Sequence, residues 1–426
     1  MYQSWIDVTK INHQSELDMW AVDYTAHPLL DPGFTRRPSR LQTLTRLAYR
    51  RVLKDDEIYR RELARLFYPL GSAQAEGIRT RELQAMAAEY LVEADIYLAS
   101  TIELLPHDCR DAVLPLPVVT SCKDVRDLMG LSFYGESERL RYEARRKLYL
   151  AQMLLQIDHT RLIQEGPNHK TNFENLLNEG LWKFTKQIHD ITIGFHLDPD
   201  GDRIRYSTRP EPGDQRWDFR STFIEKPVGG RTLALDVLYY NCRFKRAVTP
   251  ISFEVVDGAR RVVESVRWGD MRQETSGSIL SKMIRKGINN PDEIGDIIGA
   301  MFIVNDNEAL NDLLGLLDSC IGTPLGWRNV TDTLNEAPAG AELNTFSSKS
   351  FKVFKGDVDI LCEDGGRPYR YPVEIQIFTL ESYLRTVCGA HDASHLALKL
   401  RQFLYGLVPR IFPREIYGSD WLTSFI

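Results

Sequence analysis

Cationic residues in the C-terminal part of the chain have types and spacings suited to phosphate binding. The spacings of Lys282, Arg285 and Lys286 place three positive charges on one side of a helix, and Arg272 stands a short loop before them. Such a group could grip a triphosphate through charge-assisted hydrogen bonds. A solvated basic helix face has the same pattern, so both interpretations stay open on spacing alone.

Two carboxylates occupy positions that are suited to metal binding or proton transfer. Asp296 directly precedes the apolar run Ile297–Val304, which predicts a buried strand, and a carboxylate at the mouth of such a strand is a natural magnesium ligand. A capping or turn role would fit Asp296 equally well. In the run Val373–Phe378, the side-chain period of two places Glu374 and Gln376 on the face opposite the apolar residues. That face then lines a site, or belongs to a half-exposed edge strand.

The elements around these residues alternate between strand and helix. Gly277–Lys286 is predicted to be a helix that ends at Gly287. The run 297–304 is predicted to be a buried strand and 307–319 a helix, followed by strands at 351–362 and 372–378 and a long helix at 380–404. This alternation predicts a mixed sheet flanked by helices.

The N-terminal part of the chain has a helical pattern instead. Apolar residues recur at helical spacing over 41–67, 80–105, 136–155 and 173–193, and the first of these stretches is rich in arginine. Turn-rich sequence begins at Asp198, and Asp257-Gly258 joins two strand-like runs as a hairpin. We therefore predict an α+β chain with a helical region 1–197, a β-rich connecting segment 198–268 and a domain 269–426 that has a mixed sheet flanked by helices.

Composition limits the classes of function. The chain has 426 residues, a net charge of -6 and six scattered cysteines without a metal-binding spacing. These features argue against a disulfide framework, a structural zinc site and a general affinity for nucleic acid. No apolar run is long enough to span a bilayer, so we expect no membrane segment and a cytoplasmic location.

Taken together, the motifs resemble the synthetase domain of the RelA/SpoT family, over about a third of the chain. The basic stretch Arg272–Lys286, the Asp296-led strand, the Glu374-Ile-Gln376 strand and a later His391 follow in the family's order. The resemblance implies an ATP-dependent pyrophosphokinase that uses Mg²⁺ and transfers the β,γ-pyrophosphate of ATP to a 3'-hydroxyl group.

The resemblance also implies a role for each matching residue. Asp296 and Glu374 would hold magnesium, Glu374 would also accept the proton of the attacking hydroxyl, and Gln376 would position the acceptor. The ATP side would comprise Arg272, Ser278, Lys282 and Arg285, and the acceptor side Lys349, Lys352 and His391. His391 and His395 have helical spacing, which suits a metal pair or a polar face on the last helix.

Several positions depart from the family pattern. Glu274 replaces a lysine, Met301 and Phe378 replace arginines, and Ser348 stands where the family has a base-stacking tyrosine. The acceptor is therefore open between GTP or GDP, an adenosine nucleotide, and tRNA, which toxin-like members of the family modify.

The same departures favour an alternative function. A catalytically degenerate module could bind a nucleotide or a partner protein as a sensor. The region 1–197 is then a candidate regulatory element or oligomer contact, and its basic stretch 41–67 could contact tRNA phosphates or form a solvated face. No residue pattern in 1–195 reproduces the His-Asp metal site of the family's hydrolase half.

Overall fold

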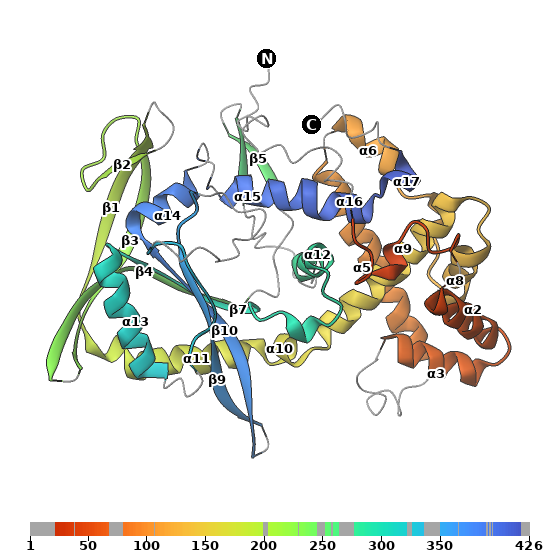
Figure 1. Cartoon of the computed structure of the whole chain (residues 1–426), viewed down its shortest axis with the longest axis horizontal. Helices are drawn as coiled ribbons and strands as arrows, with labels where there is room; N and C mark the ends of the chain where they lie inside the picture. Colours follow the sequence, from red (N-terminus) through yellow and green to blue (C-terminus); the bar gives the residue numbers. More distant parts are fainter. Residues whose placement is uncertain are drawn as a thin grey trace. The chain divides into compact units, whose positions relative to one another are not determined.

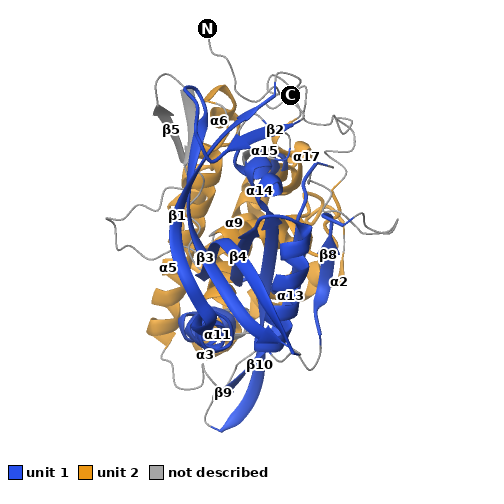
Figure 2. Ribbon diagram, turned by 90° about the vertical axis from the view of Figure 1, so that its left-hand side faces the viewer, with its two compact units in different colours: residues 1–12, 161–245, 294–401 blue, residues 13–160, 246–293, 402–426 orange. Residues whose placement is uncertain are grey.

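The structure, a computed structural model, contains two compact units that are each assembled from separate stretches of the chain (Figure 1). It describes residues 22–37, 39–67, 80–105, 107–198, 203–228, 230–244, 252–256, 259–263, 277–321, 326–335, 350–364, 366–388, 391, 393 and 395–418. Among these, unit 1 takes its residues from 161–244 and 294–401, and unit 2 from 22–160, 252–293 and 402–418 (Figure 2). The units thus divide the chain differently from the predicted boundaries at 197 and 268. That three-part division remains a prediction about independently folding domains.

Unit 1 is built on an eight-stranded mixed sheet. The strand order is β2-β1-β3-β4-β7-β10-β9-β8. Only the β7–β10 pair is parallel, and the other neighbouring strands are antiparallel. The strands are β1 (Thr185–Leu197), β2 (Ile204–Ser207), β3 (Gln215–Val228), β4 (Arg231–Phe244), β7 (Ile298–Val304), β8 (Arg328–Asp332), β9 (Phe354–Asp364) and β10 (Arg367–Thr379). The predicted α+β class with a mixed sheet is confirmed.

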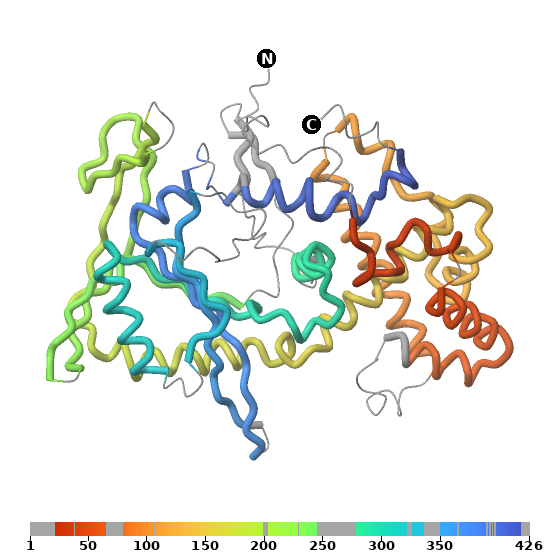
Figure 3. Tube along the Cα trace, in the orientation of Figure 1, coloured from red at the N-terminus to blue at the C-terminus, as the bar shows by residue number. Residues whose placement is uncertain are grey.

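Helices cover both faces of this sheet. α11 (Gly166–Gly180) and α13 (Asn307–Ile321) lie on one face, where Phe173, Leu177 and Leu313 join the buried strand residues in one core (Figure 1). α14 (Leu380–Val387) packs on the other face, in a second apolar cluster. The hairpin of β9 and β10 extends past the neighbouring strands (Figure 3). The remaining short helices of unit 1 are α10 (Arg161–Gln164), η3 (Trp182–Phe184) and α15 (His395–Arg401).

The predicted helix 173–193 is wrong in its second half. α11 ends at Gly180, and the chain then enters β1, which pairs with β3 along almost its whole length. Threonine and isoleucine are frequent in this segment, and β-branched residues fit a pleated strand better than a helix. The turn-rich sequence after Leu197 is the β1–β2 connection, in which the Asp198 amide donates to the Arg203 carbonyl at 2.9 Å.

Unit 2 is mainly helical, as predicted for most of the N-terminal region. Its principal helices are α2 (Arg40–Val52), α3 (Asp56–Phe67), α5 (Thr80–Glu103), α8 (Val125–Tyr134), α9 (Glu138–Asp158) and α12 (Gly277–Lys286). Its short elements are η2 (Pro28–Leu30), α6 (His107–Val113), α7 (Pro117–Thr120), η4 (Pro291–Glu293), η5 (Gln402–Leu407), α16 (Val408–Ile411), α17 (Arg414–Tyr417) and the hairpin of β5 (Ser252–Val256) and β6 (Ala259–Val263). The predicted helix 41–67 is two helices, because the Asp55 carboxylate accepts from the Glu57 and Ile58 amides and starts α3.

Three consecutive buried cations on α9 organise unit 2. The Arg145 guanidinium donates to the carbonyls of Leu29 and Asp31, and Arg146 donates to the Ile411 carbonyl. Lys147 Nζ is 2.7 Å from an Asp95 carboxylate oxygen and also donates to three carbonyls of the segment 119–122. Burying such groups is costly unless they are paired or hydrogen-bonded. These contacts tie four separate segments to one helix.

Several other local predictions are confirmed. β5 and β6 form the expected antiparallel hairpin, although its turn residues lie outside the described ones. α12 has the predicted bounds, and Gly287 follows it with a φ of 71°, a left-handed conformation that favours glycine. In the part of the chain that the structure describes, no helix combines the length and hydropathy that crossing a membrane requires.

Candidate functional site

The alternation predicted for β10 is present in the structure. Val373, Ile375 and Ile377 are fully buried in the core beneath α11 and α13. Glu374 and Gln376 therefore point to the opposite face of the sheet, because successive strand side chains alternate. On that face, α14 packs beside Phe378 of β10.

Glu374 is a buried carboxylate with both oxygens engaged. It is 3% exposed, and its Oε1 atom lies 2.7 Å from the Lys355 ammonium of β9. Its Oε2 atom accepts a hydrogen bond from the Gln376 side-chain amide. A buried carboxylate needs such partners to stay ionised at modest cost. The site thus contains an oriented, charge-compensated carboxylate.

Asp357 is a second buried carboxylate, directly opposite Glu374 in the β9–β10 ladder. Asn329 donates to its Oδ2 atom at 2.7 Å, and Asn329 itself has a φ of 50°, in the left-handed region. Burial raises the pKa of Asp357, and the negative charge of Glu374 raises it further, against the opposing effects of Asn329, Lys355 and Arg328. Two carboxylates and one ammonium thus share a poorly solvated part of the sheet.

Asp357 and Lys355 are site residues that the sequence motifs do not single out, although a weaker sequence signal is present. Within the predicted strand 351–362, Lys355, Asp357 and Asp359 alternate with apolar residues. This period of two places three charges on one face of a strand. Arg328 of β8 donates to Asp359, which extends the row of charges toward the sheet edge.

Asp296 lies in the turn that precedes β7. β7 runs parallel to β10, and its Gly299 lies opposite Glu374. A side chain at Gly295 would approach Asp357 Oδ2 to 3.6 Å, so this turn passes next to the carboxylate pair. Asp296 is partly exposed and has interaction partners of its own. The structure therefore brings the turn to the site, and the role of Asp296 as a metal ligand remains a prediction.

The predicted ATP-binding residues lie in the other unit. Ser278, Lys282 and Arg285 are on α12 of unit 2, and the latter two side chains are partly exposed. α12 is fixed within that unit by a 2.8 Å hydrogen bond between Ser281 and Tyr97. Arg272 lies outside the described residues, as do Lys349 and the departing residues Glu274 and Ser348. The joint use of α12 with Glu374 and Asp296 remains a prediction.

The acceptor-side residues divide into two cases. Lys352 is partly exposed and stands just before β9. His391 is 3% exposed and accepts a 3.0 Å hydrogen bond from the Ala393 amide through Nδ1. The predicted helix 380–404 is wrong here, because α14 ends at Val387 and Cys388 turns to extended backbone angles. His391 lies in this interruption, so it shares no continuous helix with His395 of α15.

Two of the departures from the family pattern lie in an apolar cluster. Phe378 is 4% exposed and belongs to the cluster beneath α14, with Met301 packed against it. Both lie on the sheet face that carries Gln376. Phe378 is the next residue of β10 on that face, and Met301 of β7 is paired with Gln376. The face is therefore charged around Glu374 and apolar beside it.

The expected magnesium ion has few candidate protein ligands among the described residues. Among them, no group of three or more His, Cys, Asp or Glu side chains could hold a metal. Magnesium at nucleotide sites is usually bound by one or two carboxylates together with substrate phosphates. Glu374 and Asp357 provide two carboxylates, and Lys355 already neutralises one of them. Two carboxylates are within the number that magnesium uses at such sites, and magnesium binding by Asp296 and Glu374 remains a prediction.

Comparisons with known proteins give distant structural likenesses. Neither a protein-family model nor a curated protein sequence matches the chain. Among solved structures, small alarmone synthetase 1 from Bacillus subtilis, bound to its product pppGpp, has a TM-score of 0.23 and 16% identity. That match covers 35% of this chain and 58% of the synthetase, so this chain spans less than two thirds of that protein.

Two further structures are similar at the same level. Small alarmone synthetase 2 from Bacillus subtilis has a TM-score of 0.24 and 16% identity, with 44% of this chain and 76% of that chain covered. A GTP pyrophosphokinase family protein from Streptococcus pneumoniae has a TM-score of 0.22 and 16% identity, covering 41% and 68%. The chain is thus similar, at low identity and over less than half of its length, to these proteins.

Proposed function

We propose that the chain is an ATP-dependent pyrophosphokinase that transfers the β,γ-pyrophosphate of ATP to a 3'-hydroxyl group of a nucleotide or of tRNA. The proposal rests on one observation. Glu374, a buried and ion-paired carboxylate, lies beside Gln376 on the sheet face opposite the main core, in a strand whose sequence resembles the RelA/SpoT synthetase motif. A carboxylate of this kind is unusual in a strand interior unless it has a function. The order of the flanking motifs supports the same reaction.

In this reaction the acceptor oxygen attacks the β-phosphorus of ATP. A new bond forms between that oxygen and the β-phosphorus, the bond to the α,β-bridging oxygen breaks, and AMP leaves. Glu374 takes the hydroxyl proton, and a general base at this position typically contributes about 10²–10⁴-fold. Magnesium, when bound, would neutralise phosphate charge beside Asp296 and Glu374.

The neighbours of Glu374 prepare it for this step. Gln376 donates a hydrogen bond to one carboxylate oxygen, and the ammonium of Lys355 places a positive charge beside the other. Phosphoryl-type transfer depends mainly on positioning and on charge stabilisation. Lys282 and Arg285, together with Arg272, supply the cations for the triphosphate in this proposal.

A transfer assay tests the proposal directly. The full chain is incubated with γ-labelled ATP, magnesium and, in separate reactions, guanosine nucleotides, adenosine nucleotides or bulk tRNA. We expect label in one acceptor class and an equal amount of AMP. Glu374→Gln should lower the rate by at least about 10²-fold while ATP binding persists, and Asp296→Asn should weaken magnesium-dependent ATP binding.

A matched control separates chemistry from general damage. Glu308→Gln changes an exposed carboxylate at the start of α13, in the same unit, and should leave transfer unchanged. If Glu374→Gln and Asp296→Asn both turn over at the wild-type rate, the assigned roles are incorrect. If no acceptor becomes labelled with the wild-type chain, the proposed reaction itself is incorrect.

A second function is favoured by the apolar side chains of Met301 and Phe378. The family has arginines at both positions, and here both side chains join a buried cluster instead. A module that binds a nucleotide or a partner as a sensor, without transfer, would tolerate these changes. Saturable ATP or GTP binding by calorimetry, combined with no labelled acceptor, is the result that this second function predicts.

A further inference from the structure

A row of paired residues crosses the unit 1 sheet through Glu374. Glu374 of β10 is paired with Gly299 of β7, and Gly299 is paired in turn with Arg243 of β4. On the other side of Glu374, the row continues to Asp357 of β9. The strand pairing therefore places an arginine two strands away from the proposed general base.

The core on the opposite side of the sheet shows which way Arg243 points. Its neighbour Cys242 is 6% exposed and belongs to the core beneath α11 and α13. Cys242 is paired with Ala300, which is paired with Ile375, and all three lie in that core. Because successive side chains of a strand alternate between faces, Arg243 leaves β4 on the same face as Glu374. We call this the Glu374 face.

Gly299 provides a position without a side chain between these two residues. Neighbouring strands are separated by roughly 5 Å, so the Cα atoms of Arg243 and Glu374 are about 10 Å apart. Gly299 is partly exposed, whereas Ile298 and Ala300 beside it in β7 are buried. Solvent therefore reaches the Glu374 face between the arginine and the carboxylate.

The exposed side chain of Arg243 is suited to phosphate binding. A guanidinium group binds phosphate oxygens through paired, charge-assisted hydrogen bonds. Arg243 has an interaction partner of its own, but contacts of exposed arginines contribute little, so a phosphate group can replace such a partner. In the adjacent row, Met301 lies between Asn241 and Gln376. Arg243 thus supplies a positive charge next to a position where the family has an arginine.

We propose that Arg243 binds the 5'-phosphate group of the acceptor nucleotide while the 3'-hydroxyl of the same nucleotide meets Glu374. A ribose ring separates these two groups, and Gly299 leaves room for that ring above the sheet. The proposal rests on the pyrophosphokinase function proposed above and adds the part of the acceptor that the chain recognises. The same phosphate chemistry is present in a free nucleotide and in the 3'-terminal nucleotide of tRNA.

Binding measurements with the full chain test this proposal without requiring transfer. Calorimetry compares GDP with guanosine and ADP with adenosine, and it also measures bulk tRNA, all with magnesium and saturating α,β-methylene-ATP. We expect one 5'-diphosphate to bind more tightly than its nucleoside, or tRNA to bind. Arg243→Met should reduce that preference, or the tRNA affinity, by about tenfold or more.

Two further variants separate a phosphate contact from a structural role. Arg243→Lys should retain part of the preference for the diphosphate, because lysine keeps the charge and loses the paired donors. Gly299→Ala places a methyl group where the ribose is expected, so it should weaken the binding of nucleotide and nucleoside alike. Circular dichroism should show that every variant is folded.

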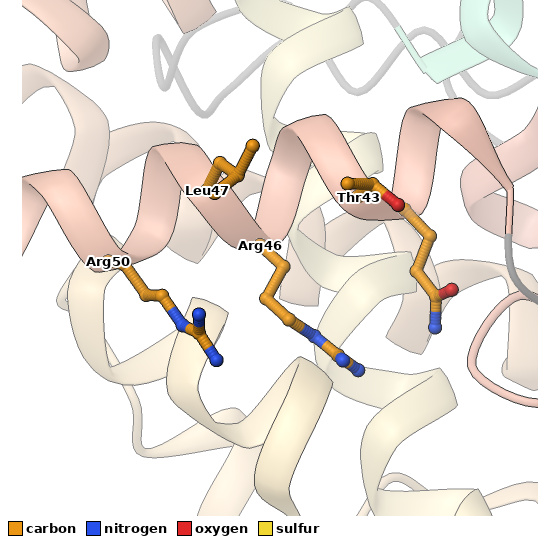
Figure 4. A pocket seen from close by; sticks show the side chains of 5 residues that line it. Thr43, Arg46, Leu47 and Arg50 are labelled. Carbon is orange, nitrogen blue, oxygen red and sulfur yellow. The ribbon is translucent and has the colours of Figure 1, made fainter.

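Two matched controls remove an exposed arginine elsewhere. Arg220→Met changes β3 on the opposite face of the sheet, because the neighbouring Phe219 belongs to the cluster beneath α14. Arg50→Met changes unit 2 at a depression of about 180 Å³ (Figure 4). That depression is lined by Gln42, Thr43, Arg46, Leu47 and Arg50. Both controls should bind every ligand as the wild type does.

The outcomes are distinct. A preference for the diphosphate that is lost only in Arg243→Met supports the proposal with a free nucleotide, and a tRNA affinity lost only in that variant supports it with tRNA. Equal losses in Arg243→Met and Arg50→Met overturn it. So does weaker binding of α,β-methylene-ATP by Arg243→Met with unchanged acceptor binding, and so does a wild-type chain that binds no acceptor. If these binding results are as expected but the transfer assay labels no acceptor, the proposed reaction is incorrect and the phosphate contact of Arg243 stands.

Discussion

Lys355→Met removes the ammonium that faces Glu374 while it keeps a side chain of similar length. The Glu374 side chain is 4% exposed and its Oε1 atom lies 2.7 Å from Lys355 Nζ. Without that ammonium the carboxylate retains the amide of Gln376 and faces the like charge of Asp357. The buried carboxylate then loses the positive charge of its β9 neighbour, so we expect unit 1 to lose stability at neutral pH.

The magnitude lies between two limits. Removing one partner of a fully buried ion pair costs about 3–5 kcal/mol, whereas an exposed pair contributes at most about 1 kcal/mol. Glu374 is at the buried limit, but the Lys355 side chain is 37% exposed, so water screens the ammonium. We therefore expect a coupling free energy of roughly 2 kcal/mol between the two residues.

A double-mutant cycle measures this coupling. Urea unfolding is recorded for the wild type, Lys355→Met, Glu374→Gln and the double variant. Tryptophan fluorescence is a suitable signal because Trp182, Trp217 and Trp327 all lie in unit 1. Lys355→Met should be clearly destabilising alone and nearly neutral when residue 374 is glutamine.

The control and the contrary outcome are specific. Lys352→Met changes a partly exposed lysine nearby, and it should shift the unfolding free energy by less than about 0.5 kcal/mol. A coupling below about 0.5 kcal/mol between residues 355 and 374 would refute the reasoning. Water would then screen the ion pair, and Glu374 would not depend on Lys355 for its charge.

Two further predictions concern pH. Burial raises the pKa of Asp357 in the folded state, so ionising this carboxyl group destabilises the fold. Its stabilising contribution is fully present below the unfolded pKa of about 3.9 and is lost as the pH rises through the higher folded pKa. Asp357→Asn should therefore stabilise unit 1 by on the order of 1 kcal/mol at neutral pH in urea unfolding; an equal gain below the unfolded pKa would contradict this cause. Burial lowers the pKa of His169, whose ring nitrogen Nε2 lies 2.6 Å from the Tyr369 hydroxyl. The contribution of His169 to folding stability is therefore fully present above the unfolded pKa of about 6.5 and is lost as the pH falls through the lower folded pKa. His169→Gln should flatten the decline of Tm on acidification, and an unchanged slope would contradict the prediction.

Sequence patterns determined the elements whose signals are local. The bounds of α12 follow from its helical spacing and from Gly287, and the outward position of Glu374 follows from the alternation of β10. The hairpin of β5 and β6 follows from its turn sequence. Each of these features depends on interactions within a few residues, so one short stretch of sequence contains the whole signal.

Other features depended on which segments meet. The stretch 185–197 has apolar residues compatible with a helix, and pairing with β2 and β3 makes it a strand. Pairing between β9 and β10 places Asp357 and Lys355 opposite Glu374 and Gln376, and a shift of one residue would have turned them to the other face. The tertiary structure also assigns α12 to unit 2 and Glu374 to unit 1. Strand register and unit membership are set by packing between distant segments, because burial of the whole apolar face selects one pairing among many, and no single stretch of sequence contains that information.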